Sequence, residues 1–295
     1  MEKCILEKIK YINYSLKKFI PKDDSIISQS MRYSVLSKGK RLRPLLVILS
    51  AELFGGKMHD VIPAACAIEY IHVYSLIHDD LPAMDNDDFR RGILTNHKKF
   101  GESVAILSGD ALLTEAFSLI LKSKSSEKNI NKAIKFISEY IGYSWMISGQ
   151  IDDIKIIKNN NLSINNDFIF LKKKIKSIYI KKTSSLIIAS LLTGSTLVGV
   201  NDNELQILKK YGINIGIAFQ IVDDILDSHD YCDNKFKYCV EKEKKKLTAL
   251  TLYTEDEAKK NVYKYIKRAE KIISIFGIKS KIFYEISKLI TSRLN

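Results

Sequence analysis

Two short clusters of aspartates are the part of the sequence best suited to chemistry. The first covers residues 79–85 and reads DDLPAMD, and the second covers residues 223–227 and reads DDILD. On a helix, Asp223 and Asp227 point in directions about 40° apart and lie one turn from each other. Crowded carboxylates repel one another unless a cation lies between them, and Mg²⁺ prefers such hard oxygen ligands together with water and substrate phosphate. The pattern therefore predicts a divalent metal site.

Each aspartate cluster follows an apolar stretch with helical spacing, residues 70–78 before the first and residues 212–222 before the second. Pro82 ends the first helix before Asp85, so the chain must loop back to bring Asp85 near Asp79. The alternative is that both clusters are solvated acids at two helix ends. Because two clusters both adjoin apolar helices, we favour a metal site.

Basic side chains near the acidic clusters could bind an anionic ligand. Residues 38–44 read KGKRLRP at the start of an apolar helix, and Arg90 and Arg91 closely follow the first cluster. Arginine offers phosphate a planar fork of donors, and lysine offers a point charge. His72 and Gln220 precede the aspartates by two turns and one turn, on roughly the same helix faces. Each signal alone is common in surfaces and cores, but their agreement indicates an anion site beside the metal.

The elements that must position these residues are predicted to be helices. Only four prolines occur, and none follows Pro82. Because proline costs about 3 kcal/mol inside a helix, the rest of the chain can form many long helices. Apolar residues recur every three or four positions, for example over residues 203–227, and no run alternates as a strand would. The sequence predicts an all-α fold with a single domain over residues 1–295.

Short polar or glycine-containing segments mark the expected breaks between helices, and none resembles an interdomain linker. These segments are residues 21–25, 54–60, 85–95, 122–131, 158–166, 200–203 and 228–243.

Composition sets wider bounds on partners and compartment. The formal charge of +13 suits nucleic acid, a membrane surface or phosphorylated substrates, but the lysines are spread over the whole chain, as in compositional drift. The start of the chain is charged and does not resemble a secretory signal. The longest uncharged run, residues 183–200, is broken by Ser, Thr and Gly, so we expect a buried helix and no membrane span. Four scattered cysteines favour free thiols in a reducing cytoplasm.

In their order along the chain, these motifs resemble the trans-prenyl diphosphate synthases, and within that family the bacterial farnesyl diphosphate synthases. The resemblance runs from about residue 38 to residue 248, and the ordered set is highly specific. The matching residues are Gly39-Lys40-Arg41-Leu42-Arg43-Pro44, His72, Asp79-Asp80, Asp85, Arg90-Arg91-Gly92, Gly149-Gln150, Asp153, Lys182-Thr183, Gln220, Asp223-Asp224 and Asp227. The resemblance implies a helical bundle of the isoprenoid synthase type, usually homodimeric, with a deep central cavity between the two Asp-rich motifs. All six carboxylates of the two motifs would face this cavity.

The resemblance also implies a role for each matching residue. Three Mg²⁺ ions, for which Mn²⁺ can substitute, would be held on the allylic diphosphate by Asp79, Asp85 and Asp223. That same diphosphate would be contacted by Arg90, Lys182 and Lys237. Isopentenyl diphosphate would be bound by Lys40, Arg43, His72 and Arg91. The remaining residues of the two acidic motifs, Asp80, Asp224 and Asp227, belong to the implied catalytic set.

The implied reaction joins isopentenyl diphosphate head to tail with dimethylallyl diphosphate and then with geranyl diphosphate, giving (E,E)-farnesyl diphosphate. Metal ions and cationic side chains would stabilise the departing diphosphate. The Lys182 carbonyl, the Thr183 hydroxyl and the Gln220 amide would stabilise the allylic cation. The released diphosphate would remove the proton, so no protein base is needed.

Product length is expected to depend on Tyr74. This residue lies five positions before Asp79, about 7–8 Å along the helix. Its direction differs from that of Asp79 by about 140°, so its ring can close the cavity further down. The resemblance implies that an aromatic residue here, together with a first acidic motif that is two residues longer, is the pattern of an enzyme that stops growth at C15. The alternative is that Tyr74 is ordinary core packing.

Two features depart from the family pattern. Ser184 follows Lys182-Thr183, where the family has glycine. The segment after Asp227 is poor in glycine and one residue short, so Lys237 keeps the family's spacing while Lys246 matches only with a deletion. These departures affect how the segment after Asp227 would close over the site and how fast the enzyme would turn over, and they leave the expected reaction class unchanged.

Four other functions compete with this interpretation. A geranyl or geranylgeranyl diphosphate synthase would share the motifs and differ in product length. A catalytically silent subunit of the same fold would be expected to lose an acidic motif, and both are intact. A terpene cyclase would have no need of Lys40, Arg43 and His72. A basic nucleic-acid binder would leave both acidic clusters unexplained, so we predict no nucleic-acid partner.

Overall fold

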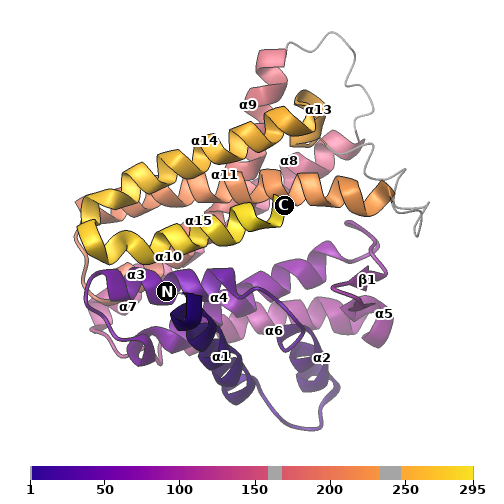
Figure 1. Cartoon of the computed structure of the whole chain (residues 1–295). Coiled ribbons are helices and arrows are strands. Elements are labelled where there is room, and N and C mark those ends of the chain that lie inside the picture. Colours follow the sequence, from indigo (N-terminus) through magenta and orange to yellow (C-terminus); the bar gives the residue numbers. More distant parts are fainter. Residues whose placement is uncertain (1, 159–167, 233–246, 295) are drawn as a thin grey trace. The chain divides into compact units, whose positions relative to one another are not determined.

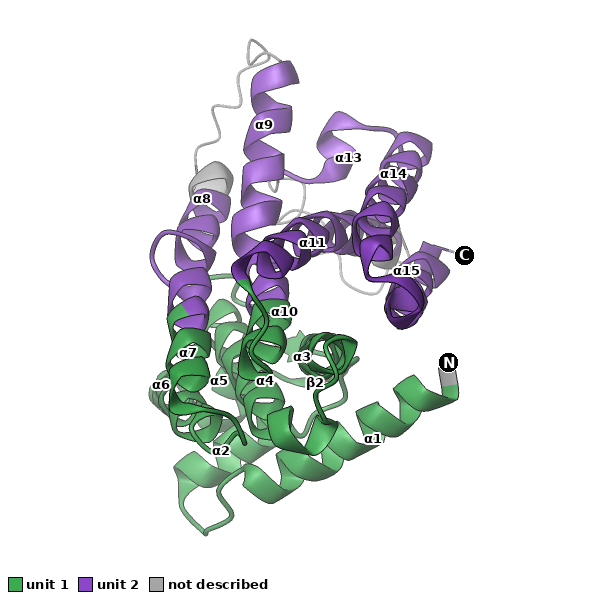
Figure 2. Cartoon of the chain, turned by 90° about the vertical axis from the view of Figure 1, so that its left-hand side faces the viewer, with its two compact units in different colours: residues 1–135, 190–201 green, residues 136–189, 202–295 purple. Residues whose placement is uncertain are grey.

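The structure is a computed structural model that describes residues 2–158, 168–232 and 247–294 (Figure 1). Helices make up nearly all of the regular structure in this part of the chain, which confirms the predicted all-α class. The chain divides into two compact units (Figure 2). Unit 1 contains residues 1–135 and 190–201, and unit 2 contains residues 136–189 and 202–295. A single domain over the whole chain stays a prediction.

Unit 1 is built around one buried helix. Its helices are α1 (Glu2–Phe19), α2 (Ile26–Val35), α3 (Leu42–Leu53), α4 (Met58–Asp79), α5 (Asn96–Phe100) and α6 (Glu102–Ile120), together with parts of α7 (Glu127–Ile141) and α10 (Ser185–Leu197). Every residue from 61 to 71 of α4 is buried. Helices α3 and α6 both pack against it. Burying an all-round apolar helix in this way fixes the end of α4, where the first acidic cluster begins.

A short hairpin after α4 interrupts the helical pattern of unit 1. Strands β1 (Phe89–Arg90) and β2 (Ile93–Leu94) pair antiparallel, and Arg91 and Gly92 between them have positive φ angles of 54° and 80°. This hairpin lies inside a segment that the sequence marked only as a break, because two-residue strands carry too few positions to show alternation.

Unit 2 contains the longest helix of the described chain. Its elements are α8 (Met146–Lys158), α9 (Phe168–Ile178), the π-helix η1 (Tyr179–Ser184), α11 (Asp202–Cys232), α13 (Ala249–Leu252), α14 (Glu255–Ile273), the 3₁₀ turn η2 (Ser274–Ser280), α15 (Lys281–Thr291) and the 3₁₀ turn η3 (Ser292–Leu294), with parts of α7 and α10. Helix α14 packs along α11. It begins with a capping box, in which Thr254 and Glu257 satisfy each other's backbone N–H groups. The expected break at 228–243 begins too early, since α11 continues to Cys232.

In the part of the chain that the structure describes, two helices are long and apolar enough to cross a membrane by length and composition, α4 and α6. The apolar window of α4 is 78% buried inside the protein, and that of α6 is 39% buried. Because the core helix of a soluble protein passes the same test, this is weak evidence for a span. The absence of a membrane span therefore stays a prediction.

Candidate active site

The first acidic cluster folds back on itself after α4, as Pro82 predicts. The backbone N–H of Asp85 donates to the carbonyl of Asp79 at 2.8 Å, and the N–H of Asn86 donates to the carbonyl of Leu81 at 3.0 Å. Asn86 has a positive φ of 52°, which asparagine tolerates better than most residues. The backbone of this loop thus brings Asp85 close to Asp79.

Asp80, the middle aspartate of the loop, lies buried against Arg90. Its carboxylate accepts from Nε and Nη2 of Arg90, both at 2.6 Å. Burial raises the pKa of Asp80 to about 7, although the Arg90 charge opposes the shift. Asp80 therefore holds Arg90 in place, which differs from the expectation that all six carboxylates face one cavity.

A group of cationic side chains surrounds His72 on α4. Its Nε2 lies 3.3 Å from Nη1 of Arg43, which comes from the start of α3. Burial lowers the pKa of His72 well below its usual value, and the charges of Arg43, Arg91 and Arg90 lower it further. His72 is thus a neutral imidazole among guanidinium groups, an arrangement suited to an anion with several oxygen atoms.

Arg91 lies against the basic segment that precedes α3. Its Nη1 donates to the carbonyl of Lys38 at 2.8 Å. A side chain on Gly39 would meet that same nitrogen at 2.6 Å, so the Arg91 guanidinium lies directly against the backbone of Gly39. The structure thereby brings residues 38–43 and the hairpin together, as the resemblance implied. Lys40 is exposed in the same segment.

Arg41, within the same basic run, has a different environment. It is 4% exposed, and its guanidinium pairs with buried Glu69 at 2.6 Å and donates to the carbonyls of Val35 and Ser37. Its left-handed backbone, with φ of 53°, begins α3. Arg41 therefore orients the segment from within the core.

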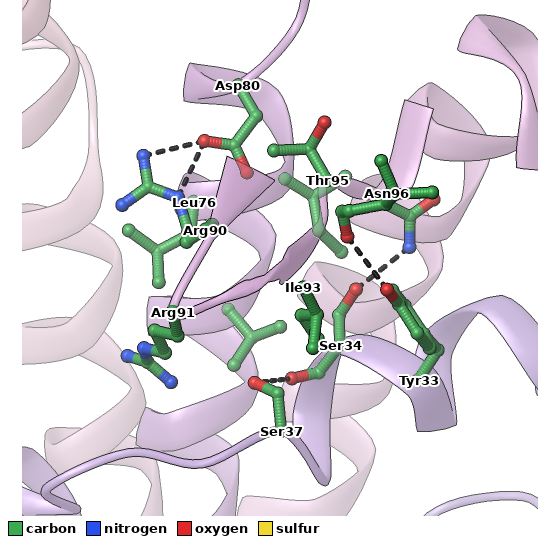
Figure 3. A pocket seen from close by; sticks show the side chains of 13 residues that line it. Tyr33, Ser34, Ser37, Leu76, Asp80, Arg90, Arg91, Ile93, Thr95 and Asn96 are labelled. Carbon is green, nitrogen blue, oxygen red and sulfur yellow. Dashed lines mark hydrogen bonds and ion pairs between the residues drawn. The ribbon is translucent and has the colours of Figure 1, made fainter. Parts of the chain in front are cut away.

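The hairpin is anchored to α2 by a polar network that the sequence did not reveal. The Asn96 side-chain amide donates to Ser34 Oγ at 2.8 Å, and the Tyr33 hydroxyl donates to the carbonyl of Leu94 at 2.8 Å. A small cavity of about 30 Å³ lies among these residues, with Asp80 and Arg90 joined on another part of its wall (Figure 3). Because the partners lie on elements far apart in sequence, no local pattern signals them. These contacts fix the backbone that carries Arg90 and Arg91.

Tyr74 packs against a second aromatic side chain of α4. It is 8% exposed, and its ring meets that of His78 edge to face with centroids 5.7 Å apart. His78 is itself fixed by α6, because its Nε2 lies 3.0 Å from the carbonyl of Ile106. A side chain on Gly109 would overlap the His78 ring, so α6 comes close to His78 at a glycine. The Tyr74 ring thus rests on a support that spans two helices.

In unit 2, Asp224 is the centre of a second buried network. Its carboxylate accepts from the Tyr179 hydroxyl, from Gln220 Nε2 at 3.0 Å and from the Ala249 N–H at 2.8 Å. Burial raises the pKa of Asp224 to about 6, against the lowering effect of these donors. Like Asp80, Asp224 is turned toward protein donors, and it positions the Gln220 amide.

The π-helix η1 presents Lys182 and Thr183. The Thr183 hydroxyl donates to Gln220 Oε1 at 2.6 Å, and Lys182 Nζ pairs with Asp153 at 2.6 Å. A side chain on Gly149 would overlap the backbone nitrogen of Lys182, so α8 approaches η1 at glycine. Isolated π-turns are common at functional sites. The predicted residues Gly149, Asp153, Lys182, Thr183 and Gln220 thus form one cluster.

The departure at Ser184 is accommodated by its neighbours. Its hydroxyl donates to the carbonyl of Tyr179 at 3.1 Å, inside the π-turn. The α11 residue that faces it is Gly216, where a side chain would meet Ser184 Cα at 2.6 Å. Serine can therefore replace the family's glycine without displacing η1 from α11.

Asp223 has a partner that the sequence did not suggest. Its carboxylate pairs at 2.5 Å with Arg293, from the 3₁₀ turn near the C-terminus, and Arg293 also stacks over the Phe219 ring at 5.2 Å. Asp227 is exposed one turn further along α11. Lys237 lies outside the described residues.

The carboxylates of the first acidic cluster fit a metal ion that binds together with a phosphate ligand. Among residues 2–158, 168–232 and 247–294, no three His, Cys, Asp or Glu side chains are grouped to hold a metal by themselves. Asp79 and Asp85 lie in one folded loop, and Mg²⁺ is usually bound through one or two carboxylates plus substrate phosphates. Asp79 and Asp85 are therefore the residues of unit 1 that would hold it.

Comparison with known proteins identifies the family. The model of the polyprenyl synthetases matches residues 24–275. The chain belongs to the polyprenyl synthetase family. This family is generally Mg²⁺-dependent and transfers prenyl groups, which agrees with the two acidic motifs.

Three similar proteins show the range within the family. A farnesyl diphosphate synthase from Bacillus subtilis is 37% identical over 272 residues, 90% of this chain and 88% of that protein. The large subunit 1 of the heterodimeric chloroplastic geranylgeranyl pyrophosphate synthase of Arabidopsis thaliana is 42% identical over 228 residues. The latter alignment covers 76% of this chain, which spans only 60% of the plant protein's length. A crystal structure of a geranyltransferase from Legionella pneumophila has a TM-score of 0.84 and 28% identity, over 99% of this chain and 96% of that one. These similarities confirm the isoprenoid synthase type of fold.

Proposed function

We propose that this chain is a Mg²⁺-dependent prenyltransferase that condenses isopentenyl diphosphate with dimethylallyl and then geranyl diphosphate to form (E,E)-farnesyl diphosphate. The observation that carries the proposal is the arrangement in unit 1. There, a neutral, half-buried histidine lies among arginines, next to a loop that folds two aspartates together. Unit 1 thus combines an anion site that needs no metal with a pair of aspartates suited to a divalent metal.

The anion site would bind isopentenyl diphosphate. Arg43 and Arg91 come from different elements and can meet different oxygens of one diphosphate, with Lys40 adding a point charge. His72 is held neutral, so it can accept or donate a hydrogen bond without adding to the repulsion among the arginines. No carboxylate is needed for this binding mode.

The allylic diphosphate would be bound by Arg90, Lys182 and Lys237, with Mg²⁺ held by Asp79, Asp85 and Asp223. When bound, Mg²⁺ supplies charge stabilisation to the departing diphosphate. Asp80 keeps the Arg90 guanidinium oriented through two hydrogen bonds. Lys182 is oriented in the same manner by Asp153.

The allylic cation would be stabilised by dipoles from η1 and α11. Because Thr183 donates its only hydroxyl proton to Gln220, its oxygen lone pairs remain the group it can present to a cation. Gln220 is held in turn by Asp224. The double bond of isopentenyl diphosphate attacks the cation, and the released diphosphate takes the proton, so no side chain must act as a base.

Product length separates this proposal from its nearest alternatives. Relatives of this chain include both farnesyl and geranylgeranyl diphosphate synthases. We favour C15 because Tyr74 is bulky, buried and supported by His78. A silent subunit is disfavoured because both acidic motifs are complete.

The test is an assay with radiolabelled isopentenyl diphosphate and Mg²⁺, offering dimethylallyl, geranyl or farnesyl diphosphate in turn. We expect incorporation with the first two acceptors and a C15 product after dephosphorylation and chromatography. A C20 product would establish the geranylgeranyl alternative, and a C10 product the geranyl alternative. Absence of incorporation by the folded protein would support the silent subunit. We further propose a cytoplasmic homodimer, with Mn²⁺ able to replace Mg²⁺.

A further inference from the structure

A second cavity lies within unit 2, on the side of α11 that faces α9, α13 and α14. Its volume is about 260 Å³. Its apolar wall includes Ile175, Ile217, Ile221 and Leu252, from three different helices. Small-molecule sites in proteins usually measure about 300–1,000 Å³, so this cavity suits a short ligand.

The polar side chains that line this cavity, among the described residues, are cationic or neutral. Lys172 and Lys176 lie one turn apart on α9, and Lys264 and Arg268 lie one turn apart on α14. No aspartate or glutamate of the described residues lines the cavity. Within the same ranges, none of these four side chains forms an ion pair with a carboxylate.

Aromatic rings hold two of these cations at the rim of the cavity. Lys172 Nζ lies 5.8 Å from the centroid of the Tyr253 ring, and the Arg268 guanidinium lies 5.7 Å from that of Tyr265. Both rings line the cavity themselves. Cation–π contacts of this kind orient a charge without neutralising it, so all four positive charges remain available to an anion.

We propose that this cavity, the α9–α14 cavity, binds a short apolar chain with an anionic head group. The chain would lie on the apolar wall, which gains free energy when it is removed from water. The head group would lie between the two pairs of cations, whose mutual repulsion an anion relieves. A phosphate-type or a carboxylate head group would satisfy this chemistry.

The α9–α14 cavity is distinct from the proposed condensation site, although the two share a wall. Tyr179 and Ala249 line it, and both also donate hydrogen bonds to Asp224, which does not line it. None of the described residues proposed to bind either diphosphate or Mg²⁺ lines the cavity. Binding here can therefore be measured without any prenyltransferase reaction, and its outcome does not depend on the proposed function.

The test is isothermal titration calorimetry of the full chain with decyl phosphate in the presence of EDTA. The chelator removes metal-dependent binding of phosphate at the acidic motifs, and every protein compared carries Arg43→Ala, which weakens the proposed metal-free anion site of unit 1. We expect saturable binding of one molecule per chain. The double variant Lys264→Glu/Arg268→Glu should weaken binding at least about tenfold, since two attractive charges become repulsive. Lys267→Glu, an exposed lysine of α14 outside the cavity, should change the Kd by less than about twofold.

A second pair of variants covers the case in which the first fails to fold. Lys172→Glu on α9 should also weaken binding, while Lys173→Glu, which is exposed and outside the cavity, should not. Circular dichroism melting curves establish that each variant is folded. Binding that does not saturate, or an unchanged Kd in the folded charge-reversal variants, would overturn the proposal.

Two further ligands identify the head group and test the role of the apolar wall. Tighter binding of decyl phosphate than of decanoate assigns the site to phosphorylated chains, and the reverse assigns it to fatty carboxylates. Either result supports the proposal. Inorganic diphosphate that binds as tightly as decyl phosphate would contradict it, because the apolar wall would then contribute nothing.

Discussion

At the scale of single residues, the neutral His72 gives the anion site a measurable pH signature. Burial, and then Arg43, lower its pKa well below 6.5 in the folded protein. As pH falls through about 6.5, the unfolded chain takes up a proton at this residue and the folded protein does not. The free energy of unfolding should therefore fall on the acid side, by at most about 1.4 kcal/mol per pH unit from this group.

The variant His72→Gln lacks that acid-side loss. We expect the unfolding free energy of the wild type to fall relative to that of the variant as pH drops from about 7.5 to about 5.5, a range that spans the ordinary histidine pKa. The measurement is urea denaturation without ligand. His59→Gln serves as the control, because the His59 side chain is 58% exposed. A pH-independent difference for His72→Gln would mean that His72 is protonated normally in the folded protein.

Tyr74 is the residue at which product length should change. Tyr74→Ala removes a buried ring that rests on His78, and we expect C20 or longer products where the wild type makes C15. Tyr74→Phe is the matched control, because it keeps the bulk of the ring and should keep C15. Chromatography of the dephosphorylated products is the measurement. If active Tyr74→Ala still stops at C15, another residue forms the floor of the cavity.

The place of a single side chain could be predicted only where the sequence itself determines which way the chain turns. Pro82 forces the chain to turn, so the approach of Asp85 to Asp79 was predicted and is confirmed. The inward direction of Asp80 and Asp224 was not predicted, because adjacent aspartates are alike in sequence and differ only in the donors that tertiary packing brings to them. The pairing of Asp223 with Arg293 was also missed, since 70 positions separate the two residues.

At the scale of elements, the contact between α8 and η1 determines where Lys182 and Thr183 lie. Gly149→Ala would place a methyl group in overlap with the Lys182 backbone nitrogen. Because backbone must move to relieve this overlap, we expect a loss of about 1–3 kcal/mol in unfolding free energy together with a lower kcat.

The control for this variant is Lys173→Ala, at an exposed position of neighbouring α9. The unfolding free energy of Lys173→Ala, from urea denaturation, and its kcat, from initial rates of condensation, should both be close to the wild-type values. Unchanged stability and kcat in Gly149→Ala would show that α8 and η1 are packed more loosely than this overlap requires.

Helices were predictable as elements because apolar periodicity and the lack of proline act over many residues. The structure keeps the expected breaks between α1 and α2 and between α3 and α4. The features that it adds include the hairpin at 89–94, the π-turn η1 and the break between α7 and α8, which depend on tertiary contacts. A π-turn has the same composition as an α-helix and arises here where Gly149 and Gly216 let neighbouring helices approach.

At the scale of the whole molecule, α6 carries an apolar face that the chain itself leaves exposed. Leu107 and Leu121, the latter at the end of the helix, are each 59% exposed, and Ile106 is 44% exposed. Large exposed apolar patches mark association sites in soluble proteins, which supports the proposed homodimer. Leu107→Glu should convert the dimer to a monomer in light scattering coupled to size exclusion. Leu6→Glu, at a similarly exposed leucine of α1, should remain dimeric. A monomeric wild type would contradict the proposal.

The central claim, metal-assisted prenyl transfer at two acidic motifs, is tested most directly by the initial rate of radiolabelled isopentenyl diphosphate incorporation with and without Mg²⁺. We predict incorporation in Mg²⁺ that EDTA abolishes, and a loss of about 10²–10³-fold in kcat for Asp79→Ala and for Asp223→Ala. The exposed Asp24→Ala should match wild type. Near-normal turnover by both variants in excess EDTA would contradict the claim.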